Sequence, residues 1–292
     1  MALMKQMPRT HRMAIIIQML LLAIICFFSP LGTASAEDMT SAAEPAEDKS
    51  AVKETIMRIG KGLSLHKQNY LLPLTWGNHD EKLKDAELKF QLSLKQRIFN
   101  SNFYLAYTQK SFWRLLDEED SSPFRETNYN PEVFYNLMPE KNPLGNWGCY
   151  LGYEHESNGS KEATSRSWDR LYLAPYYEHG RFRADLKAWY RVREDMKEYD
   201  GDPSGDDNPD IEDFYGYGEL QLRYEWANHH MASLIGRWNP ETGNSGAQVD
   251  YSWPGFGKNV FLFVQLWSGY GESLIDYNEY ITSFGFGIML KR

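Results

Sequence analysis

Residues 181–192 read Arg-Phe-Arg-Ala-Asp-Leu-Lys-Ala-Trp-Tyr-Arg-Val, and this stretch decides the fold. Side chains on a β-strand point alternately to its two faces, so every second residue shares a face. The apolar face of this stretch carries Phe182, Ala184, Leu186, Ala188, Tyr190 and Val192. The opposite face is charged, with Trp189 as its apolar exception. The pattern predicts a two-faced strand, which occurs in soluble sandwiches as well as in membrane barrels.

Similar strands follow one another along most of the chain. About twelve candidates can be delimited, and an even number is typical of bacterial membrane barrels. Their approximate positions are 67–76, 86–98, 102–113, 131–139, 146–157, 167–178, 181–193, 211–227, 229–238, 245–253, 258–269 and 277–290. Aromatic residues make up 15% of the chain, which fits the aromatic girdles of such barrels. We therefore predict an all-β fold, a twelve-stranded antiparallel transmembrane β-barrel.

The first 36 residues have the layout of a secretory signal peptide. Lys5, Arg9 and Arg12 precede a largely apolar segment, and Ala34-Ser-Ala36 is a cleavage signature. Removing these residues takes away three of the 31 Lys and Arg and none of the 40 Asp and Glu, which leaves a net charge of −12. This acidic balance argues against nucleic acid as a partner.

The remainder divides into two parts. Residues 37–60, rich in Ala, Glu, Asp and Ser, are expected to form a periplasmic N-terminal segment without a core of its own. Residues 61–292 are expected to form the barrel. Cys149 alone of the two cysteines would remain after cleavage, which excludes an intramolecular disulfide.

Residues 153–172 carry the side chains of a hydrolase. His155 and Ser157 are two residues apart, so on a strand they share a face with their Cα atoms about 6.5–7 Å apart. Residues 158–165 are rich in turn formers, and an antiparallel return would bring Asp169 opposite His155. We predict Ser157 as nucleophile, His155 as general base and Asp169 as the group that orients the imidazole.

This candidate triad lies at the end of an apolar face. Trp147, Leu151 and Tyr153 precede His155 on that face, and Leu171 follows Asp169. The apolar face of a soluble protein is its core, whereas the apolar face of a membrane barrel contacts lipid. The pattern therefore indicates that the substrate is the lipid itself.

The motif His155-Glu-Ser-Asn-Gly159, followed by Ser165-Arg-Ser-Trp-Asp-Arg170, resembles that of the outer-membrane phospholipase A family. Further similar stretches are spread over most of the mature chain, in the order of the family: 89–94, 107–111, 121–129, 207–211 and 268–278. The resemblance implies a calcium-dependent serine esterase in the outer membrane of a Gram-negative bacterium. Such an enzyme hydrolyses the sn-1 and sn-2 acyl esters of phospholipids, and lysophospholipids, on the outer barrel wall, and it is activated as a homodimer.

The resemblance also implies roles for individual residues. The Gly159 amide would stabilise the oxyanion, and Gln109 would hydrogen-bond across the dimer interface. Calcium would be held by residues that offer oxygen atoms: the Ser160 carbonyl, the Ser165 side chain, Ser121 of the partner subunit and, in a site used by the monomer, Asp207. Calcium prefers such oxygen ligands.

Two positions depart from the family pattern. Asp169 stands where the family usually has Asn, and Asp is the ordinary third member of soluble triads, so we expect activity to be kept. Ser160 stands where the family usually has Arg, but the expected ligand there is a backbone carbonyl.

Two other functions remain compatible with the pattern. A porin-like or structural barrel would make the triad accidental and would require an open lumen, although many charged and aromatic inward residues favour a filled one. A soluble periplasmic β-protein would be extracted without detergent.

Overall fold

The structure is a computed structural model, and it describes residues 62–77, 86–99, 101–114, 124–137, 145–199 and 205–290. All of these residues belong to one compact unit, Lys49–Arg292. The expected signal peptide and the expected periplasmic segment lie outside the described residues. Within that described part, no helix is long and apolar enough to cross a membrane.

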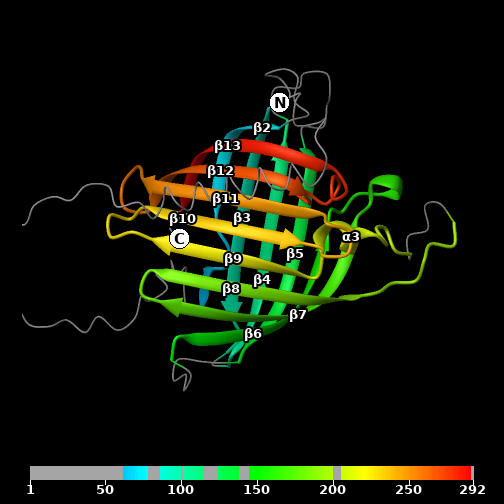
Figure 1. Cartoon of the computed structure of the whole chain (residues 1–292), viewed down its shortest axis with the longest axis horizontal. Helices are drawn as coiled ribbons and strands as arrows, with labels where there is room; N and C mark the ends of the chain where they lie inside the picture. The colour runs from blue at the N-terminus through cyan, green and yellow to red at the C-terminus, as the bar shows by residue number, and fades with distance from the viewer. Residues whose placement is uncertain are drawn as a thin grey trace, which may run out of the picture. The chain divides into compact units, whose positions relative to one another are not determined.

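The described residues form strands joined in antiparallel pairs (Figure 1). The strands are β1 (Leu63–Leu65), β2 (Tyr70–Gly77), β3 (Glu87–Arg97), β4 (Phe103–Trp113), β5 (Phe124–Asn136), β6 (Trp147–Ser157), β7 (Ser167–His179), β8 (Phe182–Val192), β9 (Gly218–Glu225), β10 (Met231–Trp238), β11 (Ser245–Pro254), β12 (Val260–Tyr270) and β13 (Tyr280–Leu290). The short helical elements are η2 (Glu162–Thr164) and α3 (Ile211–Tyr215).

The sheet closes on itself. Each strand from β3 to β12 pairs with the next strand along the chain. The last strand, β13, pairs with β2, and β2 pairs with β3. The short β1 also pairs with β3, beyond the end of β2, so β1 and β2 act as one interrupted strand. Over the described residues this gives a closed antiparallel barrel of twelve strands, β2–β13, as predicted. Closure leaves no sheet edge with unpaired backbone groups, which a lipid environment requires.

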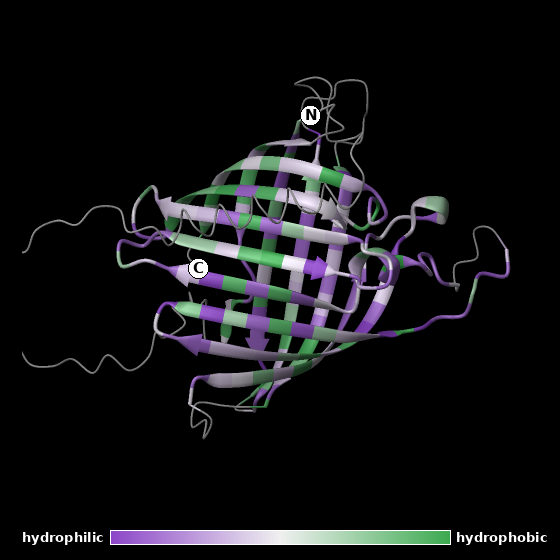
Figure 2. Ribbon diagram, in the orientation of Figure 1, coloured by the Kyte–Doolittle hydropathy of each residue, from purple (hydrophilic) through white to green (hydrophobic). Residues whose placement is uncertain are grey.

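The alternation read from residues 181–192 is present on β8. Leu186 and Tyr190 point outward and are exposed, whereas Trp189 and Arg191 are buried inside the barrel. Figure 2 shows the same alternation of hydrophobic and hydrophilic residues along neighbouring strands. The outward apolar side chains include Leu92, Leu105, Leu151, Leu171, Leu173, Leu220, Leu266, Phe284 and Phe286. They form the band that contacts lipid.

The barrel interior is polar and filled. Lys89 and Glu272 form a buried ion pair of 2.8 Å, and Glu154 is fully buried between cationic side chains. At one end of the strands, α3 contributes Ile211 and Tyr215 to a buried apolar cluster. Charges removed from water need partners, and these interior residues supply them to one another. The packing argues against a wide aqueous channel.

Two strand predictions need correction. The strand expected at 131–139 is β5, which begins at Phe124 and ends at Asn136. The strand expected at 211–227 is α3 followed by the shorter β9. At the start of β5 polar residues occupy both faces, so alternation does not mark the strand. Gly216, with a φ of +67°, ends α3 before β9 begins.

Candidate active site

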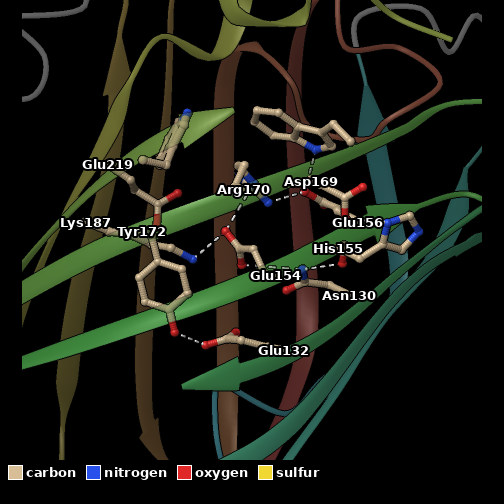
Figure 3. A network of polar contacts seen from close by, with 12 residues as sticks. Asn130, Glu132, Glu154, His155, Glu156, Asp169, Arg170, Tyr172, Lys187 and Glu219 are labelled. Atoms are coloured by element: carbon tan, nitrogen blue, oxygen red, sulfur yellow. Dashed lines mark hydrogen bonds and ion pairs between the residues drawn. The ribbon is translucent and has the colours of Figure 1, made fainter. Parts of the chain in front are cut away.

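The β6–β7 hairpin brings the predicted base and its orienting carboxylate together. His155 and Asp169 are direct cross-strand neighbours. The His155 Nδ1 atom lies 3.0 Å from Asp169 Oδ1, at hydrogen-bond distance (Figure 3). Both side chains lie on the outward face, partly exposed, at the end of the strand pair. The expected register is therefore the one that forms.

Ser157 is the last residue of β6 and lies two residues beyond His155 on the same face. Its neighbours across the two adjacent strands are Tyr129 of β5 and Ser167 of β7. Its side chain makes no hydrogen bond within the described part of the chain, to His155 or to any other residue. Catalytic hydrogen bonds often tighten only when substrate binds, so this geometry is compatible with a nucleophile.

The turn after Ser157 is organised by Asn158. The Asn158 Oδ1 atom accepts hydrogen bonds from the amides of Ser160 and Arg166, at 3.2 and 3.0 Å. Its Nδ2 donates to the Thr164 carbonyl at 2.8 Å. The side chain is buried. Asn158 was expected only as one of several turn formers, but its side chain fixes the loop that carries the predicted oxyanion and calcium residues.

Gly159 follows with a left-handed φ of +65°. A Cβ atom at this position would lie 3.1 Å from the Tyr129 ring, so both the backbone conformation and the space favour glycine. Among the described residues no partner for the Gly159 amide is found. The amide is therefore available to an incoming anionic oxygen.

Asp207 gathers the hydroxyl groups of the next loop. The Ser165 Oγ donates to Asp207 Oδ2 at 2.6 Å, and Ser167 Oγ donates to the same oxygen at 3.4 Å. Lys197 Nζ lies 2.5 Å from Asp207 Oδ1. Ser165 and Asp207 thus meet, although the prediction assigned them to two different calcium sites, and the Lys197 ammonium already lies against this carboxylate. Ser121 lies outside the described residues.

The donor set around Asp207 fits a hard cation. A carboxylate and a hydroxyl offer oxygen, the ligand type that Ca²⁺ prefers. Burial raises the pKa of the nearby Glu194, and the carboxylates of Asp206 and Asp169 add to this effect. No group of three or more His, Cys, Asp or Glu side chains suited to a metal occurs in the described ranges. The predicted ligands are mostly carbonyl and hydroxyl oxygens, so that result does not conflict with them.

A buried polar network supports the hairpin from inside the barrel (Figure 3). Glu154 pairs with Arg170 at 3.1 Å and with Lys187 at 2.7 Å. The Asn130 Nδ2 atom donates to the His155 carbonyl at 2.9 Å. This contact fixes the backbone of the predicted base. Asn130 lies on β5, 25 residues away, and no local sequence pattern points to this contact.

Gln109 is a polar residue on the outward wall of β4. Its Oε1 accepts a hydrogen bond from Tyr107 Oη at 3.2 Å, and its Nε2 donates to Ser111 Oγ at 3.1 Å. Leu92 and Tyr129, its neighbours on the adjacent strands, are exposed. Polar side chains on lipid-facing surfaces, such as this amide, often form hydrogen bonds to a neighbouring protein segment in the membrane.

Fold and site together define an integral β-barrel with a hydrolase-type set of side chains on its outer wall. The family model for Phospholipase A1 matches residues 48–290. The Phospholipase A1 of Salmonella typhimurium is 41% identical over 223 residues, 73% of this chain and 73% of the relative. The chain belongs to the phospholipase A1 family.

Two solved structures are similar along most of the chain. Outer membrane phospholipase A from Escherichia coli matches with a TM-score of 0.68 and 37% identity, over 78% of this chain and 98% of that one. The Salmonella typhi outer membrane phospholipase, solved as a dimer with bound calcium, matches with a TM-score of 0.68 and 36% identity, over 80% of this chain and 94% of that one.

Proposed function

We propose that the protein is a calcium-dependent outer-membrane phospholipase A that hydrolyses sn-1 and sn-2 acyl esters of phospholipids and lysophospholipids. The observation that carries this proposal is the 3.0 Å approach of His155 Nδ1 to Asp169 Oδ1 on an outward wall, with Ser157 beside them. Lipid tails offer no hydrogen bonds to a carboxylate or an imidazole, so placing these groups on a lipid-facing wall costs free energy. Polar residues at such positions usually have a function, and hydrolysis of lipid is the function proposed for these two.

The chemistry starts with proton transfer from Ser157 to His155. The Ser157 oxygen attacks the ester carbonyl carbon, and collapse of the tetrahedral intermediate breaks the bond to the glycerol oxygen. His155 returns its proton to that leaving oxygen. Water, deprotonated by His155, then cleaves the acyl-serine ester, which releases the fatty acid and restores the Ser157 hydroxyl. Asp169 holds the imidazole in position throughout.

The developing oxyanion needs a donor close to Ser157. The Gly159 amide is proposed for this role because it follows the nucleophile by two residues and has no partner among the described residues. Preorganised donors of this kind typically contribute about 10²–10³ in rate.

Calcium is proposed at the loop beside the triad. The Ser160 carbonyl, the Ser165 hydroxyl and Ser121 of the partner subunit would hold it in the dimer, and Asp207 would belong to a site used by the monomer. The ion would supply positive charge that stabilises the oxyanion. The Salmonella typhi relative solved as a dimer with bound calcium supports this assignment.

Dimerisation is proposed to use the wall around Gln109. We expect Gln109→Leu to weaken the calcium-dependent dimer about threefold to twentyfold, because an interchain hydrogen bond of a polar side chain in a membrane is worth about 0.6–1.7 kcal/mol. Sedimentation equilibrium in detergent with calcium measures the change. Leu220→Val, a lipid-facing substitution on β9, serves as the control. An unchanged dissociation constant for Gln109→Leu would place the interface elsewhere.

The proposed location is the outer membrane of a Gram-negative bacterium, reached through cleavage of residues 1–36. Residues 37–60 would then remain in the periplasm. The apolar outward band of the barrel and the outer-membrane relative from Escherichia coli support this location.

The function is tested with a mixed-chain phospholipid whose sn-1 and sn-2 fatty acids differ. We expect the refolded protein to release both acids in the presence of calcium, since the triad is open to lipid rather than enclosed in a pocket. Chromatography of the released acids measures the ratio. A folded barrel that releases neither acid but conducts ions in planar bilayers would support the porin-like alternative instead.

A further inference from the structure

Asp169 has a second hydrogen-bond donor besides His155. The Tyr153 Oη donates to Asp169 Oδ1 at 2.6 Å. The same oxygen lies 3.0 Å from His155 Nδ1. Tyr153 and His155 lie on the same outward face of β6, and Tyr153 is the diagonal neighbour of Asp169 across the hairpin.

The surroundings of Asp169 explain why a second donor matters. Its outward neighbours Leu171 and Val192 are exposed and apolar. Within the described residues, the hydrogen-bond donors to its side chain are Tyr153 and His155. A carboxylate in apolar surroundings is unfavourable without donors, and a hydrogen bond to an ionised group is stronger than a neutral one. The Tyr153 hydroxyl therefore stabilises the negative charge of Asp169 and also fixes the orientation of the carboxylate.

We propose that Tyr153 is a positioning residue, which holds the Asp169 carboxylate so that Oδ1 faces the imidazole of His155. The proposal rests on the proposed catalytic function of Ser157, His155 and Asp169. It adds Tyr153 to these three residues as a group that acts through Asp169. An aromatic hydroxyl anchored in the strand limits rotation of the carboxylate. His155 then stays in the orientation that directs its other nitrogen toward Ser157.

A tyrosine near a membrane surface also has a simpler role, as an interfacial anchor. Tyr190 on β8 provides the comparison. Tyr153, Leu171 and Tyr190 occupy one row across β6, β7 and β8, so the two tyrosines share a height on the wall. Tyr190 is exposed, and it has no hydrogen bond in the described part of the chain. An anchoring role would affect both tyrosines, whereas a positioning role concerns Tyr153 alone.

The test compares Tyr153→Phe, Tyr190→Phe, Asp169→Ala and the Tyr153→Phe/Asp169→Ala double variant. We expect Tyr153→Phe to lower kcat about tenfold with little change in KM, as fits the loss of one hydrogen bond to a charged group. Tyr190→Phe should match the wild type. The double variant should be no slower than Asp169→Ala, because Tyr153 acts through Asp169. Heat-dependent gel mobility establishes that each barrel is folded.

Three results would overturn the positioning role: full activity of Tyr153→Phe, equal losses in both tyrosine variants, or losses that multiply in the double variant. A wild-type protein without hydrolase activity would overturn the proposed function instead. The ¹⁵N NMR signals of His155 then decide the positioning role separately. Tyr153→Phe should shift His155 from a fixed tautomer toward a mixture, and unchanged signals would contradict it.

Discussion

Ser157→Ala should lower kcat for phospholipid hydrolysis by about 10⁴-fold or more, because loss of the nucleophile in a triad removes the covalent route. The residual rate should not depend on His155 or Asp169, since these residues act through the serine. Fatty-acid release by the refolded protein in calcium-containing detergent measures the effect. The expected loss is about as large as that for His155 and larger than that for Asp169.

Ser268→Ala is the matched control for this substitution. Ser268 lies near the end of β12 and is partly exposed, and its hydroxyl is within hydrogen-bond distance of Tyr280. We expect this variant to retain the wild-type rate. If Ser157→Ala kept more than a few per cent of the activity, another group would be the nucleophile and the hairpin would have a structural role.

The barrel could be predicted because its outward face follows a simple rule. On β8, every second residue is apolar, and local alternation is sufficient to define the strand. The first half of β5 breaks that rule, because Arg125 and Thr127 are polar like Glu126 and Asn128, which are buried on the opposite face. The backbone amides of Leu274 and Ile275, almost 150 residues further along the chain, donate to Asn128 and Glu126. No local pattern contains such long-range partners.

The same distinction applies to the site. The pairing of His155 with Asp169 spans 14 residues across one hairpin, so turn content and strand period were enough to predict it. Asn130 and Lys197 reach the site from β5 and from the 193–210 loop, which only the closed barrel brings close. The proximity of Tyr153 and Asp169 could have been predicted from the sequence, since diagonal neighbours on one face of a hairpin can be in contact. Its hydrogen bond depends on side-chain direction, which periodicity does not give.

Removal of calcium should lower hydrolysis about 10²–10³-fold, the typical cost of losing one oxyanion-stabilising group. The barrel itself should remain folded, because its closure rests on strand pairing and on interior ion pairs such as Lys89 with Glu272. The measurement is fatty-acid release in excess chelator and after calcium is restored. Sedimentation of the same samples should show the dimer only when calcium is present.

Lys197 offers a sharper form of the calcium test. Its ammonium lies 2.5 Å from Asp207 Oδ1, where it competes with an added cation for the carboxylate. We expect Lys197→Met to lower the calcium concentration needed for half-maximal calcium binding several-fold, because the competing charge is gone. Isothermal titration calorimetry measures this independently of activity. Two results together would contradict the calcium assignment: full hydrolysis in excess chelator, and no calcium binding by the wild type or by Lys197→Met. Lys197 would then be the cation that neutralises Asp207, and the enzyme would work without the metal.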